Sequence, residues 1–216
     1  MIVEVWSDIV CPWCYIGKRR LERALGEFEH ADEVEVVWRS FQLDPSHPKG
    51  VREPTYDMLA KKFGASAAQV RQMTSRVTSV AAEEGLAYDF DRALSVNTFD
   101  AHRLTHLAKA HDAGPAAHER LMHAHFMEGE ALDDVETLVR LGAEVGVPAQ
   151  EARRVLTGDA YTQDVEEDIR AARSLGASGV PFFVLDRAYG ISGAQPLEVF
   201  ASALRQAYEA AGAAAR

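Results

Sequence analysis

The first 40 or so residues contain two strand-like segments around one helix-like segment. Residues 2–6 (IVEVW) alternate apolar and polar side chains and are rich in β-branched residues, which predicts a strand. Residues 34–38 (VEVVW) predict a second strand, and residues 12–28 between them carry apolar side chains at helical spacing. A strand, a helix and a strand in so short a span predict two parallel strands joined by a right-handed crossover.

The pattern then changes twice along the chain. A turn-rich connector at 44–50 (DPSHPKG) precedes a block from about 53 to 175 with helical periodicity, and no strand is predicted within that block. Strand signals then return as an apolar run at 180–185, a turn at 186–187, a short strand at 189–192 and a closing helix at 196–211. The predicted order is βαβ, a helical block, then ββα, which is an α/β fold.

Both cysteines of the chain lie at the end of the first predicted strand, in the sequence Cys11-Pro12-Trp13-Cys14. Pro12 suits the first helical position, where its missing N–H group is not needed. Cys11 then lies at a helix N-terminus, whose partial positive charge and free N–H groups favour a thiolate over a thiol. The thiolate is the nucleophile of thiol–disulfide exchange, and Cys14 lies one turn further on, where it can attack a mixed disulfide. The pair is therefore predicted to be redox-active, with Pro12 and Trp13 restricting and covering it.

A metal site and an incidental pair are the alternatives. Two cysteines cannot complete a structural zinc site, which needs about four ligands, so histidines would have to supply the others. His102 and His106 have zincin spacing, but Arg103 follows His102 where a zincin has Glu. We therefore expect no metal. An incidental pair would not explain why both cysteines lie at a strand-to-helix junction.

The charge of the chain limits its partners. It carries 33 acidic and 23 basic residues, a formal net charge of -10, which argues against nucleic acid and weakly against an anionic membrane surface as a partner.

The sequence has no apolar run of about 18 residues, so no membrane-spanning helix is predicted, and the N-terminus lacks the features of a signal peptide. We expect a cytoplasmic protein, in which a close cysteine pair is more often catalytic or metal-bound than structural.

Two further residues are candidates near the cysteines. Pro181 precedes an apolar run, and a cis Val180–Pro181 bond would turn the backbone of Val180 outward to pair with a peptide near Cys11; an ordinary trans proline at a strand start is the alternative. Asp8 lies three residues before Cys11, and a carboxylate there could exchange a proton with Cys14. A plain turn or cap aspartate is the alternative for Asp8.

These features together resemble a known family. The segments SDIVCPWCYIGKRRLE, WRSFQLDP, NTFDAHRL and GVPFFVLD…ISGAQP are similar to the FrnE-like subfamily of DsbA-type oxidoreductases in the thioredoxin superfamily. The resemblance extends to about residue 207. It implies a thioredoxin-like fold with a large all-helical insertion, the DsbA type, with residues 1–50 and 160–216 in the thioredoxin-like domain and 51–159 in the insertion.

The resemblance also implies an activity, that of a thiol–disulfide oxidoreductase or isomerase. In it Cys11 would be the exposed nucleophile, Cys14 the resolving cysteine and Pro181 the cis-proline, with Pro12, Trp13 and Val180 contacting the substrate. Asn97 and His102 are expected to face the cysteines across the domain junction; a helix cap is the alternative for Asn97.

The same resemblance implies the reactants. No cofactor is expected besides the Cys11–Cys14 disulfide, with glutathione as a candidate reductant. The expected partners are a disulfide-containing protein or small-molecule disulfide and a reducing partner, either glutathione or the thioredoxin system. A homodimer is one open alternative.

One departure and two rival functions follow from the motif. DsbA has His between its cysteines where this chain has Trp13, which supplies no positive charge to the Cys11 thiolate, so we expect a less oxidising pair.

Kappa-type glutathione transferases and hydroxychromene-carboxylate isomerases resemble the same fold, but they use a single Ser or Cys near the helix start. The presence of Cys14 therefore favours dithiol exchange. A non-catalytic chaperone-like or small-molecule-binding protein is the third alternative.

Overall fold

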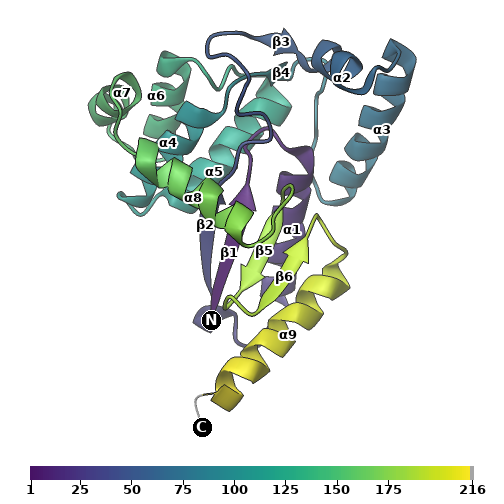
Figure 1. The fold of residues 1–216 in the computed structure, drawn as a ribbon, viewed down its shortest axis with the longest axis vertical. Coiled ribbons are helices and arrows are strands. Elements are labelled where there is room, and N and C mark those ends of the chain that lie inside the picture. Colours follow the sequence, from purple (N-terminus) through teal and green to yellow (C-terminus); the bar gives the residue numbers. More distant parts are fainter. Residues whose placement is uncertain (215–216) are drawn as a thin grey trace. The chain divides into compact units, whose positions relative to one another are not determined.

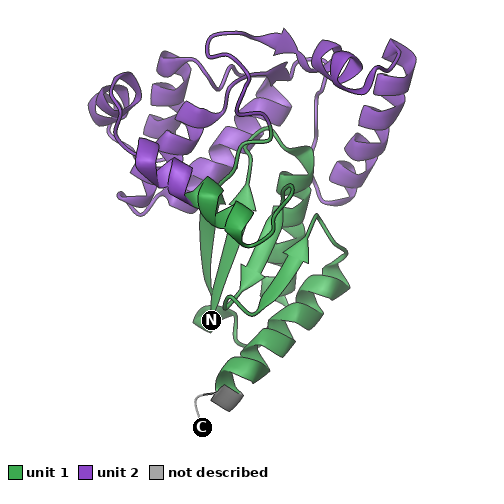
Figure 2. Cartoon of the chain, in the orientation of Figure 1, with its two compact units in different colours: residues 1–43, 168–216 green, residues 44–167 purple. Residues whose placement is uncertain are grey.

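A computed structural model describes residues 1–214 of the chain. These residues form two compact units (Figure 2). Unit 1 contains residues 1–43 and the chain from residue 168 onward, and unit 2 contains residues 44–167. No helix within residues 1–214 combines the length and the apolarity that crossing a membrane requires.

Unit 1 is built on a four-stranded mixed sheet (Figure 1). Its strands are β1 (Ile2–Ser7), β2 (Glu35–Ser40), β5 (Phe182–Leu185) and β6 (Tyr189–Ser192), in the order β2-β1-β5-β6. β1 is parallel to β2, as the βαβ pattern predicts, and antiparallel to β5. The turn between β5 and β6 contains residues 186–188, and its first two residues have left-handed backbone conformations, Asp186 with φ 44 and Arg187 with φ 55. The predicted α/β thioredoxin-like fold is confirmed.

The two faces of this sheet carry different side chains because neighbouring residues of a strand point to opposite sides. Val3 and Val5 belong to an apolar core that includes residues of helices α1 (Pro12–Gly26) and α9 (Leu197–Ala214). Trp6, on the opposite face of β1, packs with Ala172 of helix α8 (Thr162–Ser174). A short 3₁₀ turn, η1 (Ala31–Glu33), leads from α1 into β2.

An ion cluster ties α8 to the sheet on the Trp6 face. Arg39 donates to the Glu4 carboxylate from Nη2 at 2.8 Å and Nε at 3.1 Å, and to Asp168 Oδ1 at 3.2 Å. Asp168 Oδ2 also accepts from the backbone N–H of Ser40 at 2.9 Å. Glu4 and Asp168 are both buried, so the guanidinium of Arg39 compensates two carboxylates that have lost most of their hydration.

Unit 2 is predominantly helical. Its helices are α2 (Thr55–Phe63), α3 (Ala67–Glu83), α4 (Phe99–Lys109), α5 (Gly114–His123), the π-helical turn η2 (Ala124–Glu128), α6 (Val135–Glu144), α7 (Ala149–Thr157) and the start of α8. The prediction that this block lacks strands is wrong. β3 (Glu53–Pro54) and β4 (Leu94–Ser95) pair antiparallel, but two residues are too few to show the alternation by which a strand is recognised in a sequence.

The connector at 44–50 groups with unit 2, whereas the prediction places it in the thioredoxin-like domain. Lys49 Nζ lies 2.7 Å from Asp100 Oδ2, and the carbonyl oxygen of His47 accepts from Asn97 Nδ2 at 2.6 Å. These contacts join residues about 50 positions apart, so a turn-rich segment gives no local indication of them.

We predict that Arg39→Leu lowers the free energy of unfolding by about 2 kcal/mol, because it removes the guanidinium that pairs with both buried carboxylates. Glu4 then keeps only its 3.3 Å contact with Arg187, whose side chain is 78% exposed. The side chain of Arg39 is 33% exposed, which keeps the effect below that of a fully buried pair. The matched control is Arg154→Leu, whose side chain is 77% exposed beside Glu151 and should change stability by less than about 0.5 kcal/mol. Urea unfolding followed by circular dichroism measures both; equal stability changes would contradict this role of Arg39.

Candidate functional site

The cysteines lie where β1 passes into α1. Cys11 is the N-cap of α1, with φ -89 and ψ 113, and Pro12 is the first helical residue, as predicted. The N–H of Cys11 donates to the Asp8 carbonyl at 3.1 Å, and the N–H of Cys14 donates to the Cys11 carbonyl at 3.0 Å. The Cys11 side chain makes no capping hydrogen bond, and both cysteines are in the dithiol form. Backbone groups therefore close this turn without using the Cys11 sulfur.

The prediction that Cys11 is exposed is wrong for this structure. Cys11 is 3% exposed and Cys14 1% exposed. Cys11 is covered because its Sγ faces the segment before β5, where it donates to the Val180 carbonyl oxygen at 3.6 Å. Trp13, between the two cysteines, is 40% exposed, so of the three it is the side chain that solvent reaches.

The Val180–Pro181 segment has the geometry that the sequence suggested. The peptide bond is cis, and Pro181 directly precedes β5, which begins at Phe182. The Pro181 carbonyl accepts from the N–H of Gly193, just after β6, at 2.8 Å. The segment is thus anchored on the β6 side while the Val180 carbonyl contacts Cys11. Cys11, Cys14, Val180 and Pro181 come together within unit 1.

The two thiols are not equivalent. Burial raises the pKa of the Cys14 thiol well above its ordinary value, and the hydrogen bond and negative charge of Cys11 act in the same direction. Hydrogen bonds from the Asp8 backbone and the Ser7 side chain lower the pKa of Cys14, but by less. Burial and the neighbouring Cys11 thus favour the thiol form of Cys14. Sequence reasoning missed Ser7, whose only signal is a hydroxyl at the end of a buried strand.

Asp8 is buried beside this turn. Its Oδ2 accepts from the backbone N–H of Leu43 at 2.8 Å, so the carboxylate fixes the position of the chain just after β2. A backbone hydrogen bond of Asp8 contacts Cys14 and lowers its pKa. A proton-transfer role for the carboxylate stays a prediction.

Asn97 and His102 belong to unit 2. Asn97 Oδ1 accepts from the N–H of Phe99 at 2.9 Å, which satisfies a donor in the first turn of α4, although the N-cap position itself is Thr98. His102 is buried one turn into α4. Their participation at the cysteines stays a prediction. Across residues 1–214, no three His, Cys, Asp or Glu side chains gather in a way that could hold a metal ion.

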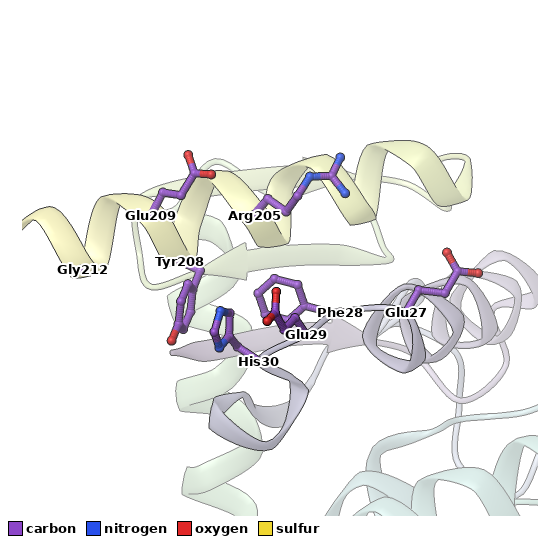
Figure 3. Close-up of a pocket in the computed structure, with 8 residues that line it drawn as sticks. All are labelled: Glu27, Phe28, Glu29, His30, Arg205, Tyr208, Glu209 and Gly212. Carbon is purple, nitrogen blue, oxygen red and sulfur yellow. The ribbon is translucent and has the colours of Figure 1, made fainter.

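A separate hollow of about 800 Å³ lies at the other end of α1 (Figure 3). The His30 and Tyr208 rings stack there at 4.1 Å, and the Tyr208 hydroxyl donates to Glu33 Oε1 at 2.9 Å. That hydrogen bond raises the pKa of Tyr208. The 15 residues of α1 span about 22 Å, so this hollow is not part of the cysteine site.

A mixed sheet with a C-x-x-C pair at the N-terminus of α1, next to a cis-proline, defines a protein of the thioredoxin class. The sequence matches the family described as the DSBA-like thioredoxin domain over residues 2–205, and the chain belongs to this family. This is a family of thioredoxin-fold oxidoreductases, as the resemblance of the sequence indicated.

Individual relatives agree with this assignment. The chain is 48% identical to a probable DsbA oxidoreductase from Streptomyces coelicolor, with a TM-score of 0.94, over 97% of this chain and 90% of that one. It is 29% identical to the uncharacterized protein YwbO of Bacillus subtilis over 205 residues, 94% of either chain.

Two more distant structures share the fold. The cytosolic disulfide reductase DsbM from Pseudomonas aeruginosa, solved with GSH, has 21% identity and a TM-score of 0.67 over 97% of this chain and 100% of that one. A 2-hydroxychromene-2-carboxylate isomerase has 19% identity and a TM-score of 0.71 over 95% of each chain. At these identities the likeness concerns the fold alone.

We predict that iodoacetamide adds one label to the reduced native protein between pH 7 and 8.5, and that the label is on Cys11. Cys14 should be labelled only after unfolding, because burial and Cys11 keep it protonated. Intact-mass measurement with peptide mapping counts and locates the labels. Label on Cys14 of the native protein, at a rate similar to that of Cys11, would contradict this difference between the thiols.

The raised pKa of Cys14 also predicts a pH dependence of stability. The folded protein keeps the Cys14 proton at pH values where the unfolded chain, with an ordinary thiol pKa of about 8.5, releases it. The stabilising contribution is therefore complete below about pH 8.5 and is lost as the pH rises through the folded-state pKa. The stability difference between wild type and Cys14→Ala, measured by urea unfolding from pH 7 to 10, should shrink with rising pH; a constant difference would refute this.

Proposed function

We propose that this protein is a thiol–disulfide oxidoreductase or isomerase that acts through Cys11-Pro12-Trp13-Cys14. The observation that carries the proposal is the asymmetric cysteine pair at the N-terminus of α1, with the Cys11 sulfur 3.6 Å from the Val180 carbonyl oxygen. Cys11 is the N-cap of α1, and the raised pKa of Cys14 keeps the second thiol protonated until it is needed.

The proposed exchange has two steps. The Cys11 thiolate attacks one sulfur of a substrate disulfide, so that a Cys11–substrate disulfide forms and the other substrate sulfur leaves as a thiolate. Cys14 then loses its proton and attacks the Cys11 sulfur, which forms the Cys11–Cys14 disulfide and releases the second substrate thiolate. The substrate gains two electrons and the protein loses two. The reverse sequence oxidises a substrate dithiol, and attack without net transfer isomerises a disulfide.

The surroundings of Cys11 indicate how a substrate would bind. A substrate must displace the contact between Cys11 and Val180, which leaves the Val180 backbone able to pair with an extended peptide. Trp13 supplies an exposed aromatic surface beside the reacting sulfur, and Pro12 fixes the backbone between the cysteines. The proposed substrate is a disulfide-containing protein or a small-molecule disulfide.

Recycling requires a reducing partner, for which we propose glutathione or the thioredoxin system. The solved DsbM structure with GSH supports glutathione by analogy of fold.

We also propose cytoplasmic localisation and membership of the FrnE-like subfamily. We propose no nucleic-acid or membrane partner, in keeping with the net charge of -10. The homodimer remains an open alternative.

The isomerase fold neighbour makes glutathione-dependent isomerase or transferase chemistry the main rival. That chemistry needs one activated group near the helix start, whereas here Cys14 lies beside Cys11 and is hydrogen-bonded to it. A resolving thiol has a purpose only in dithiol exchange. A purely binding role would leave unexplained why the Cys11 side chain faces the Val180 backbone.

We predict that the wild type catalyses insulin reduction by glutathione, and that Cys11→Ser abolishes this activity. Cys14→Ser should retain attack by Cys11 and accumulate a mixed disulfide, visible as a mass increase. A glutathione transferase would instead conjugate 1-chloro-2,4-dinitrobenzene, and its activity would survive Cys14→Ser. Insulin reduction that is unaffected by Cys11→Ser would rule out the proposed function.

We also predict that the Cys11–Cys14 couple is less oxidising than that of DsbA, for which the reduction potential is about −120 mV. Trp13 offers no positive charge or ring proton to stabilise the Cys11 thiolate in the reduced form. A titration in glutathione buffers measures the potential of the wild type. Trp13→His should raise it, and a wild-type value at or above that of DsbA would contradict this explanation.

A further inference from the structure

We propose that Gly17 and Arg20 of α1 are positioning residues for disulfide exchange, because together they hold the Val180–Pro181 segment at a fixed distance from the cysteines. This inference rests on the proposed function. Gly17 lies three residues after Cys14, and Arg20 lies one turn further on, on the same side of the helix. Neither is part of the C-x-x-C motif.

Gly17 allows Pro181 to pack directly on the backbone of α1. A Cβ atom at Gly17 would lie 3.1 Å from Pro181 Cγ, 3.1 Å from Phe183 Cζ and 3.5 Å from Ala194 Cβ. The first two distances are shorter than ordinary carbon–carbon contacts, so any larger residue must push one of these groups away. The missing side chain therefore determines how closely α1 approaches the segment before β5.

Phe183 is the neighbour less able to move. It is completely buried, and its ring packs edge-on against Phe200 of α9 at 4.8 Å and 82°. Pro181 lies in a segment outside the strand, and the N–H of Gly193 donates to its carbonyl oxygen at 2.8 Å. A methyl group at Gly17 would therefore be accommodated mainly by displacing Pro181 from α1, which also moves the Val180 carbonyl away from Cys11.

Arg20 binds the residues that follow β6, and these in turn contact Pro181. Its Nη1 donates to the Ala194 carbonyl at 2.8 Å and lies 3.4 Å from the Gln195 carbonyl. Ala194 follows Gly193, whose N–H donates to Pro181. A chain of contacts thus runs from Arg20 through residues 193–194 to Pro181.

Consequently α1 positions both the cysteine sulfurs and the Val180 backbone. Its N-terminus carries the Cys11 and Cys14 sulfurs, and its second turn sets the position of the Val180 backbone that a peptide substrate would pair with. A shift in this position should affect peptide substrates, which need Val180, more than small disulfides, which need only the Cys11 sulfur.

The test compares Gly17→Ala with Gly26→Ala. Both variants add one methyl group to α1, but a Cβ at Gly26 would meet no atom within 4 Å. We expect Gly17→Ala to lower kcat/KM for reduction of a peptide disulfide about tenfold or more, with the rate of reaction with DTNB changed less than about twofold. Gly26→Ala should change neither rate. Arg20→Met, which keeps the aliphatic stem without overpacking, should shift the peptide-to-DTNB ratio in the same direction.

The outcomes separate this inference from the proposed function. Unchanged peptide kcat/KM in Gly17→Ala and Arg20→Met, with an active wild type, would overturn the positioning role alone. Equal losses toward peptide and DTNB would also overturn it, because they would indicate general damage to the fold. A wild type without Cys11-dependent exchange would overturn the proposed function itself, and the DTNB rates would still report on Cys11.

Discussion

The approach of α1 to the segment before β5 is the contact on which the cysteine site depends, and the register of the sheet produces it. Trp6 of β1 is paired with Phe182 of β5. Cys11 lies five residues after Trp6, and Val180 lies two residues before Phe182. Because the two strands are antiparallel, Cys11 and Val180 lie at the same end of the sheet. A one-residue slip would turn every side chain of the strand to the opposite face and separate the two.

The two faces of the sheet maintain this register in different ways. On the α1 and α9 face the contacts are apolar, and Val3, Val5 and Phe183 contribute mainly by burial. On the α8 face, Arg39 joins β2 to Glu4 of β1 and to Asp168 of α8. Hydrogen bonds from a guanidinium are directional, so this cluster defines the relative position of three elements in a way that apolar packing alone does not.

Much of unit 1 could be predicted because its signals are local. Alternation identifies β1, the residues at 186–187 identify the β5–β6 turn, and Pro12 identifies the start of α1. The features that were missed depend on distant residues or on very short elements. β3 and β4 contain two residues each, and the burial of Cys11 comes from Val180, 169 positions away. Periodicity carries no information about such contacts.

The contacts of Arg20 and Ser7 show the same limit at the site itself. Arg20 belongs to the basic run KRR, which by composition predicts only a solvated face, yet it binds the Ala194 carbonyl 174 positions away. Ser7 looks like an ordinary strand residue, and its hydrogen bond to Cys14 exists only because α1 folds back over the end of β1. Only the assembled sheet and helix reveal these contacts near the cysteines.

The difference between the two thiols gives the proposed exchange an internal order. Before reaction, burial, the hydrogen bond with Cys11 and the negative charge of Cys11 all raise the pKa of Cys14. When Cys11 enters a mixed disulfide, its sulfur loses that charge, so the Coulombic contribution disappears. The hydrogen bonds from Ser7 and from the Asp8 backbone remain, and both favour the Cys14 thiolate. We infer that the first step would lower the pKa of Cys14, the thiol that acts in the second step, so that Cys14 releases the substrate only after Cys11 has captured it.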